Sequence, residues 1–213
     1  MAIVINGSGT VTGLAVGGLP DGTVDAGTLA TNSVDSAELI DGAIDTSHIA
    51  ANQITSTILP TGSVLQVVQA IKLDTFTMSS TTFATITGLS AAITPTSTSS
   101  KILVFASVTA GHDQDDGHSY LQIHDSNNGF VATPSSAGNR TGAFCVLNST
   151  TVGEMQSYAF NFLSSPSTTS AITYNIQARS TATIFVNRSD RDTNNSSFDG
   201  RGMSTITLME IAG

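Results

Sequence analysis

Isolated aliphatic residues recur every five positions through the first third of the chain. They fall on two registers, each with a spacing of ten: Leu14, Val24, Val34, Ile44, Ile54 and Val64 on one, and Leu19, Leu29, Leu39, Ile49 and Leu59 on the other. The residues between them are almost all small, polar or acidic. Such a segment cannot bury a core alone, because each repeat needs neighbouring repeats or chains to cover its apolar side chains. The pattern therefore predicts a shaft built from several copies of the chain, and favours a structural or adhesive protein over an enzyme.

Residues 21–60 form four decapeptides, DGTVDAGTLA, TNSVDSAELI, DGAIDTSHIA and ANQITSTILP. The second position is Gly or Asn, which tolerate positive φ, and the fifth is Asp or Thr, which are helix N-cap residues. Each decapeptide is predicted to contain a turn, a short extended piece and a single helical turn, stabilised by packing between chains because one-turn helices are unstable alone. A coiled coil is the alternative, but heptads require a mean spacing of 3.5 residues. We expect the aliphatic tracks to line a shared axis, at Val24, Leu29, Val34, Leu39, Ile44, Ile49, Ile54 and Leu59.

The charge distribution excludes several classes of partner. The net charge is −9, and residues 1–62 contain six acidic residues and no Lys or Arg. An acidic chain without a basic stripe argues against binding to nucleic acid and to anionic membrane surfaces. The N-terminus lacks the charged and apolar regions of a signal peptide, and no apolar run is long enough to span a bilayer. We therefore expect no nucleic-acid partner and no membrane insertion.

Three zones follow from the change in composition along the chain. Residues 1–20 begin with the strand-like Ile3, Val4 and Ile5 and continue into a Gly-rich stretch, which predicts an anchoring arm that becomes ordered on a partner. A frayed terminus is the alternative. Residues 21–62 are the repeat stalk, and residues 63–213 are a head domain.

The head consists of short β-rich runs separated by polar turns. Strands are predicted at residues 63–70, 83–87, 101–108, 120–123, 143–147, 158–162, 172–177, 182–186 and 205–209. Several of these runs alternate apolar and polar residues with a period of two. Strands of this number and length predict a mainly β fold, with a β-sandwich or jelly-roll head after an elongated stalk.

The segments INGSGTVTGL, GGLPDGTVDAGTLA, TNSVDSAELIDGAIDTSHIA and STITLMEIAG resemble fibre proteins of tailed bacteriophages, particularly marine and cyanobacterial ones. The resemblance implies a virion protein assembled in the host cytoplasm, attached through its N-terminus to a tail, baseplate or capsid protein. It also implies a homotrimer with a C-terminal β-sandwich, often similar to the tumour-necrosis-factor jelly roll. The family includes tail fibres that touch the host as well as head fibres and capsid decoration proteins, and no motif here separates the two. A tail fibre for host attachment is our first interpretation.

One long polar loop is a candidate for receptor binding. Residues 187–201 combine arginines, carboxylates, amides and one Phe, a mixture that suits recognition of a host-surface glycan. The candidate residues are Arg188, Asp190, Arg191, Asn194, Asn195, Phe198 and Arg201. The alternative is a solvated connection held by internal Arg–Asp pairs.

Candidates for metal binding and catalysis are few. Asp113, Asp115 and Asp116, within the HDQDDGH run at 112–118, offer the oxygen ligands that Ca²⁺ prefers, but no Glu follows at the twelfth position. An ordinary loop, or a histidine metal site on the trimer axis, is the alternative, and no other cofactor is expected. The single Cys145 lies in an apolar run and is interpreted as a small buried hydrophobe. Because no nucleophile elbow, phosphate loop or His pair is present, we expect no enzyme, and a polysaccharide-cleaving spike is the least favoured alternative.

Overall fold

The computed structural model describes residues 4–5, 11–12, 39, 44–45, 47–51, 53–55, 58–113, 118–131, 134–135, 138–148, 153–194 and 199–213. The chain divides into two compact units, Met1–Gln53 and Ile54–Gly213. The described residues contain β-strands, turns and loops but no helix, so the prediction of a mainly β protein is confirmed for them. The predicted arm, stalk and head boundaries at residues 20 and 62 stay predictions.

The first unit contains a short antiparallel pair near the N-terminus. β1 (Val4–Ile5) pairs with β2 (Val11–Thr12), with Val4 opposite Thr12. Two of the predicted anchor residues, Val4 and Ile5, form β1, and the third, Ile3, lies outside the described residues. Their contact with a particle stays a prediction.

Tight turns recur every five residues along the described part of the repeat. In each turn a backbone N–H donates to the carbonyl oxygen three residues earlier. The first unit has two of these bonds, from His48 to Asp45 and from Gln53 to Ala50. The second unit has two more, from Ile58 to Thr55 and from Ser63 to Pro60. Each turn begins one residue after an aliphatic track residue, so the backbone repeats every five residues, whereas the sequence predicted one helical turn in ten.

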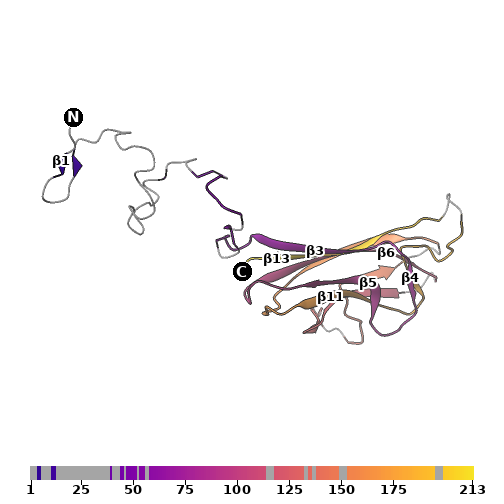
Figure 1. Ribbon diagram of the computed structural model, residues 1–213. Coiled ribbons are helices and arrows are strands. Elements are labelled where there is room, and N and C mark those ends of the chain that lie inside the picture. The colour runs from indigo at the N-terminus through magenta and orange to yellow at the C-terminus, as the bar shows by residue number, and fades with distance from the viewer. Residues whose placement is uncertain are drawn as a thin grey trace. The chain divides into compact units, whose positions relative to one another are not determined.

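The second unit contains two antiparallel sheets (Figure 1). Sheet I contains β3 (Val64–Lys72), β4 (Phe76–Met78), β6 (Lys101–His112), β10 (Gln156–Ser164), β12 (Ile184–Val186) and β13 (Ser204–Ile211). Sheet II contains β5 (Ala84–Ile93), β7 (His118–Asp125), β8 (Gly129–Phe130), β9 (Cys145–Asn148) and β11 (Ile172–Ser180). Every strand predicted for this unit is present in it, and of its described strands only the short β4 and β8 were not predicted.

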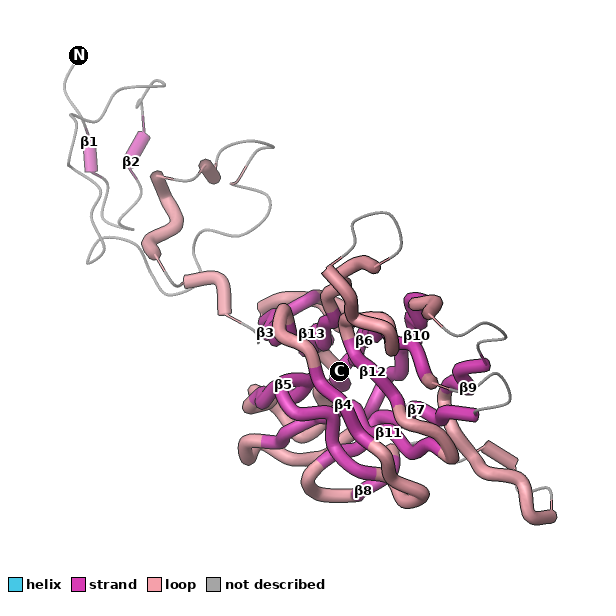
Figure 2. Tube along the Cα trace, turned by 90° about the vertical axis from the view of Figure 1, so that its right-hand side faces the viewer, coloured by secondary structure: helices cyan, strands magenta, loops and turns pink. Residues whose placement is uncertain are grey.

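The pairing of the strands is that of a jelly roll. Ala110 on β6 pairs with Gln156 of β10 and with Val186 of β12, so these two strands lie on opposite edges of β6. β13 lies on the same edge of β6 as β12, because Ala106 pairs with Phe160 of β10 on one side and with Ile206 of β13 on the other. Sheet I therefore runs β3-β13-β6-β10, and sheet II runs β5-β11-β7-β9 (Figure 2). This order of eight antiparallel strands, with consecutive strands mostly in different sheets, gives the double Greek key of a jelly roll.

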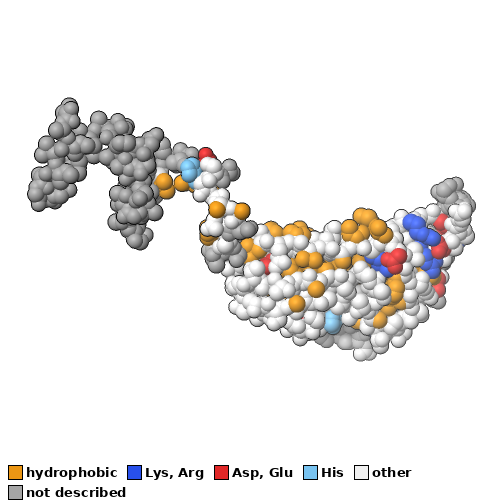
Figure 3. Space-filling view, in the orientation of Figure 1, with side chains coloured by type: hydrophobic (Ala, Val, Ile, Leu, Met, Phe, Trp, Pro, Cys, Tyr) orange, Lys and Arg blue, Asp and Glu red, His pale blue; other side chains and the backbone are white. Residues whose placement is uncertain are grey.

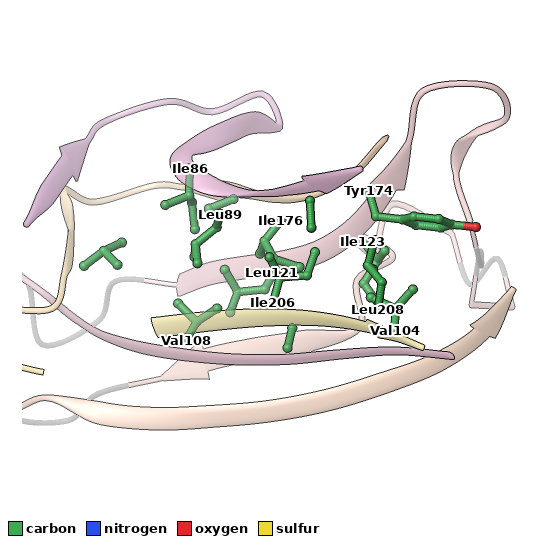
Figure 4. Packing of buried hydrophobic residues seen from close by; sticks show 14 of the residues in the cluster. Ile86, Leu89, Val104, Val108, Leu121, Ile123, Tyr174, Ile176, Ile206 and Leu208 are labelled. Carbon is green, nitrogen blue, oxygen red and sulfur yellow. The ribbon is translucent and has the colours of Figure 1, made fainter. Parts of the chain in front are cut away.

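The core lies between the inner faces of the two sheets (Figure 4). Val104 and Val108 on β6 and Leu208 on β13 face Leu121 and Ile176 of sheet II, and all five are fully buried. Strands β11 and β13 alternate strictly between buried and half-buried residues, as expected of strands with one face on a core. Burial of this aliphatic cluster, at roughly 1.5–3 kcal/mol for each large side chain, holds the two sheets together.

The two ends of the sandwich differ in what they carry. The chain enters at the proximal end, where Gly62 N–H donates to Ala212 O and Ala212 N–H donates to Ser63 O, both at 2.8 Å. β6 ends and β13 begins at the opposite, distal end. The described residues of the two polar segments singled out in the sequence, 112–113, 118, 187–194 and 199–201, therefore belong to the distal end. Figure 3 shows a cluster of acidic and basic side chains at that end of the head.

Candidate functional site

The base of the long distal loop is fixed by Asn187. This residue follows β12, is fully buried and has a φ of 61°, in the left-handed region. Its Nδ2 donates to the carbonyl oxygens of Lys72 and Asp74, each at 2.9 Å, and its Oδ1 accepts the Ser204 hydroxyl at 2.7 Å. A backbone bridge between Arg188 and Arg201 then closes the loop. The Asn187 side chain therefore links the segment between β3 and β4 to the start of β13.

Asp199 organises the interior of the loop. Its side chain is 3% exposed and accepts the Ser189 hydroxyl at 2.8 Å, Arg191 Nε at 3.1 Å, and the backbone N–H of Thr193 at 3.2 Å. The Thr193 hydroxyl donates to the same carboxylate. These donors, the Thr193 hydroxyl first, outweigh burial and lower the pKa of Asp199 to about 2. The carboxylate is therefore ionised throughout the neutral and mildly acidic range.

Arg188 is held against the end of the sandwich by several contacts. Its guanidinium lies 4.2 Å from the centroid of the Phe185 ring, a cation–π contact. Nη1 donates to the carbonyl oxygens of Ser189, at 3.0 Å, and Asp190, at 3.4 Å, while Nη2 donates to Thr77 Oγ1 at 3.0 Å. This arginine, one of the predicted receptor-binding residues, is therefore occupied with contacts inside the head.

The other arginines of the loop form ion pairs with its carboxylates. Arg191 pairs with Asp199, and Arg201 pairs with Asp192. Asn194 is exposed, whereas Asn195 and Phe198 lie outside the described residues. The geometry is that of a closed loop with internal Arg–Asp pairs, and its binding to a receptor stays a prediction.

The predicted metal site is described only in part. Asp113 accepts the backbone N–H of Thr183 at 2.9 Å through Oδ1, while Asp115 and Asp116 lie outside the described residues. Within the described ranges, no three His, Cys, Asp or Glu residues are grouped so that they could hold a metal ion. Binding of a divalent cation at 113–116 stays a prediction.

The outer face of sheet I exposes several large apolar side chains among uncharged polar ones, a feature that the sequence analysis did not single out. We call the outward-facing residues of β3, β6, β10 and β13 the apolar face. Its apolar members are Val64, Val67, Ile71, Leu103, Phe105, Ala159, Leu163, Met209 and Ile211. The uncharged polar residues between them are Gln69, Ser107, Thr109, Ser157, Asn161, Thr205 and Thr207. Val67 is 55% exposed, Ile71 53%, Phe105 41% and Leu163 45%. The one charged residue on this face is Lys101, at its proximal end. Figure 3 shows hydrophobic groups over the part of the head where Figure 1 draws β3 and β13.

The outer face of sheet II is polar instead. Three consecutive cross-strand pairs of β7 and β11 form its centre: Tyr120 with Arg179, Gln122 with Gln177, and His124 with Asn175. Gln122 Nε2 donates to Gln177 Oε1 at 2.6 Å, and the Arg179 guanidinium lies 5.5 Å from the Tyr120 ring centroid. We call these six residues the polar face. The alternation of polar residues in ITYNIQARS and HSYLQIHD was visible in the sequence, but the pairing of the two strands was not.

The aliphatic track residues of the repeat are exposed where they are described. Leu39, Ile44, Ile49 and Ile54 are between 40% and 54% exposed, and Leu59 is half-buried. Val24, Leu29 and Val34 lie outside the described residues. The trimer axis through these residues stays a prediction. Among the described residues, no helix has the length and hydropathy needed to cross a membrane.

Comparison with known proteins identifies no close relative. No protein-family model matches the chain, and no curated protein matches it. Among solved structures, the chain is similar to that of the infectious bursal disease virus Gt strain, with 14% identity, a TM-score of 0.37, and coverage of 71% of this chain and 39% of the other. It is also similar to a mutant VP2 protein of the same virus, with 14% identity, a TM-score of 0.35, and coverage of 70% and 36%. The chain thus spans well under half the length of those proteins, and similarity at this level does not assign a function.

Proposed function

We propose that this protein is a structural fibre of a virion, in which three copies pack through the apolar face of sheet I and display the head for adhesion to a host-cell surface. The resemblance of the repeat and the last strand to tailed-bacteriophage fibres supports the virion role. The contrast between the two outer faces of the head supports the assembly.

The single observation that carries the assembly is the exposure of large apolar side chains on sheet I. Monomeric soluble proteins rarely expose contiguous apolar patches of more than a few hundred Å². Here Val67, Ile71, Phe105 and Leu163 are all more than 40% exposed on one sheet face. With a single charge, at its edge, this face offers little to a charged partner, so a second copy of the same face, with its apolar and uncharged polar side chains, is the occupant that fits it.

Packing of the apolar face around an axis also determines which face of the head points outward. If the apolar face is turned toward the axis, the polar face of sheet II is turned outward, because the two are the opposite outer faces of one sandwich. Three outward faces on one fibre, and many fibres on one particle, convert individually modest contacts into strong attachment through avidity.

The assembly is tested with two variants that add the same charge to different faces. Phe105→Lys places an ammonium in the middle of the apolar face, and Ser90→Lys places one on exposed β5 of sheet II. The full chain and both variants are compared by native mass spectrometry and thermal melting. We expect Phe105→Lys to dissociate or melt at a lower temperature, with Ser90→Lys unchanged. Equal behaviour of the two variants would contradict the assignment of the apolar face.

The position on the particle is tested by gold-antibody labelling of purified virions with antibodies against residues 63–213. Label at the tail or baseplate supports host attachment. Label scattered over the capsid replaces that role with that of a head fibre or capsid decoration protein, and absence of label from the particle removes the virion role.

A further inference from the structure

We infer that the polar face of sheet II, centred on Arg179, is a binding surface for acidic polysaccharide. The inference deepens the proposed adhesive function by naming the surface and the chemical class of its ligand, and it rests on that function for the ligand's origin at a cell surface. It does not use the distal loop, whose arginines are engaged within the loop.

The first argument comes from the pairing of positive charges. The chain has seven Lys and Arg residues against sixteen Asp and Glu. Lys72 is buried and pairs with Asp74 at 2.9 Å, and Arg188, Arg191 and Arg201 all lie within 4 Å of loop carboxylates. Arg179 has no carboxylate partner among the described residues. In a strongly acidic protein, a guanidinium left without an acid is the group that an external anion would pair with.

The second argument comes from the hydrogen-bond donors of Arg179. A guanidinium has five N–H donors. Arg179 uses one nitrogen, Nη1, which donates to Thr141 Oγ1 at 3.1 Å, and its Nε is buried with no acceptor in the described structure. By contrast, Arg188 donates to three acceptors through its two terminal nitrogens. Because Nε is buried, the donors that an incoming carboxylate could meet are those of the terminal nitrogens, of which Nη1 alone makes a hydrogen bond in the described structure.

The third argument comes from what surrounds Arg179. At the outward positions of β5, β7 and β11 and at Val146 of β9, the described residues include no Asp or Glu. They include instead the amides of Gln122, Gln177 and Asn175 along two adjacent strands. Planar amides beside an aromatic ring suit the hydroxyl groups and apolar patches of a sugar.

The neighbouring strand supplies the aromatic and apolar part of this surface. Tyr120 pairs directly with Arg179 on one side and with Val146 of β9 on the other, and Val146 is 48% exposed. The row therefore presents a guanidinium, a phenol ring and an exposed aliphatic side chain across three adjacent strands. A row that combines planar hydrogen-bonding groups with one aromatic ring fits an extended sugar chain better than a protein partner, whose binding centres on large buried apolar anchors.

The test is a calorimetric titration of the full chain with polygalacturonate oligosaccharides, with neutral dextran oligosaccharides as the control ligand. We expect the acidic sugar to bind, with an affinity that falls as salt is raised, and dextran to bind at least ten-fold more weakly. Arg179→Gln should weaken binding by roughly ten-fold or more, and Arg179→Lys, which keeps the charge but not the planar fork, should bind with intermediate affinity.

Two matched variants test the location of the binding surface. Lys101→Gln removes an exposed charge from sheet I, and Arg191→Gln removes one from the distal loop. Both are expected to bind as the unaltered chain does. If Arg191→Gln lost binding while Arg179→Gln bound as before, the binding surface would lie on the distal loop. If the unaltered chain did not bind the acidic sugar, the inference would be overturned. Thermal melting of each variant verifies that the head remains folded.

The native mass of the same samples separates this inference from the proposed function. A monomeric chain that binds uronates through Arg179 would refute the trimer and keep the binding surface. A trimer that binds no uronate would refute the binding surface and leave the assembly standing.

Discussion

Glu210 Oε1 accepts the backbone N–H of Thr96 at 2.6 Å, which joins the last strand of the chain to the loop between β5 and β6. The Thr96 hydroxyl donates to the same oxygen at 2.7 Å. Oε2 accepts Gln66 Nε2 at 2.6 Å, and that amide also donates to Thr94 O at 2.7 Å. Glu210 is fully buried. One carboxylate therefore ties together β13, β3 and the β5–β6 loop at the end where the chain enters the head.

Glu210→Gln is expected to lower the free energy of unfolding of the head by about 1–3 kcal/mol. A glutamine keeps the shape, but its amide nitrogen would face N–H groups that already donate at this site. Urea unfolding measures the effect. Glu154→Gln, the same change at an exposed position, is the control and should leave the stability unaltered.

The same carboxylate predicts a dependence of stability on pH. Burial raises the pKa of Glu210, but hydrogen bonds, chiefly those from Gln66 and Thr96, outweigh burial and hold the pKa below its usual value of 4.5. A lowered pKa in the folded state stabilises the fold above pH 4.5, and this contribution is lost as the pH falls through the folded pKa. The difference in unfolding free energy between the unaltered chain and Glu210→Gln should therefore shrink on acidification. A difference that stays constant from pH 7 to pH 2 would show that this carboxylate is not the group responsible.

Asn187→Ala should destabilise the head strongly. The change leaves the carbonyl oxygens of Lys72 and Asp74 and the Ser204 hydroxyl without their partner, and it places alanine at a φ of 61°. The expected loss is about 2–4 kcal/mol of unfolding free energy. Asn139→Ala, at an exposed turn residue, is the comparison. Similar unfolding midpoints for the two variants would mean that Asn187 does not hold the distal end together.

Asp199→Asn should loosen the distal loop without melting the sandwich. The neutral amide no longer pairs with Arg191, and its nitrogen cannot accept from Thr193 or Ser189. Trypsin is expected to cleave after Arg191 faster in this variant, while the thermal midpoint of the head changes little. Asp190→Asn removes the same charge from a carboxyl whose buried Oδ1 makes no hydrogen bond in the described structure, and it should be cleaved at the original rate.

Ile44→Asp should destabilise the stalk if the aliphatic tracks line a shared axis, because it would bring three carboxylates together near that axis. Ile44 is 51% exposed in the single chain, so the change costs little unless other copies cover it. Gln53→Asp adds the same charge at an exposed position outside the tracks. The melting temperature of the assembly distinguishes the two variants. The same melting temperature for both would argue against a shared axis lined by the aliphatic tracks.

The sequence predicted the strands of the head because their alternation is a local property. In QSYAFNFLS, for example, Tyr158, Phe160 and Phe162 turn inward while Ala159, Asn161 and Leu163 turn outward. The five-residue spacing of aliphatic residues likewise matches the five-residue recurrence of turns from Asp45 to Ser63. That spacing is also local, but the sequence analysis predicted one helical turn in every ten residues, so a turn at every fifth residue was not predicted.

The candidate site was harder to predict because it depends on which distant residues meet. The sequence places Arg188, Arg191 and Arg201 in one polar loop, but it does not show that Phe185, Asp199 and Asp192 engage their side chains. The apolar face was not predicted either, since Val67, Phe105 and Leu163 belong to strands far apart in sequence. Arg179 stands out only once its neighbours across the sheet are known.

The native mass of the full chain, measured over a range of protein concentrations, tests the central claim most directly. The chain mass is 21.8 kDa, and assembly through the apolar face predicts a species of three times that mass that persists on dilution. A species of 21.8 kDa at all concentrations would contradict the trimer and leave the exposed side chains of sheet I without their proposed partner.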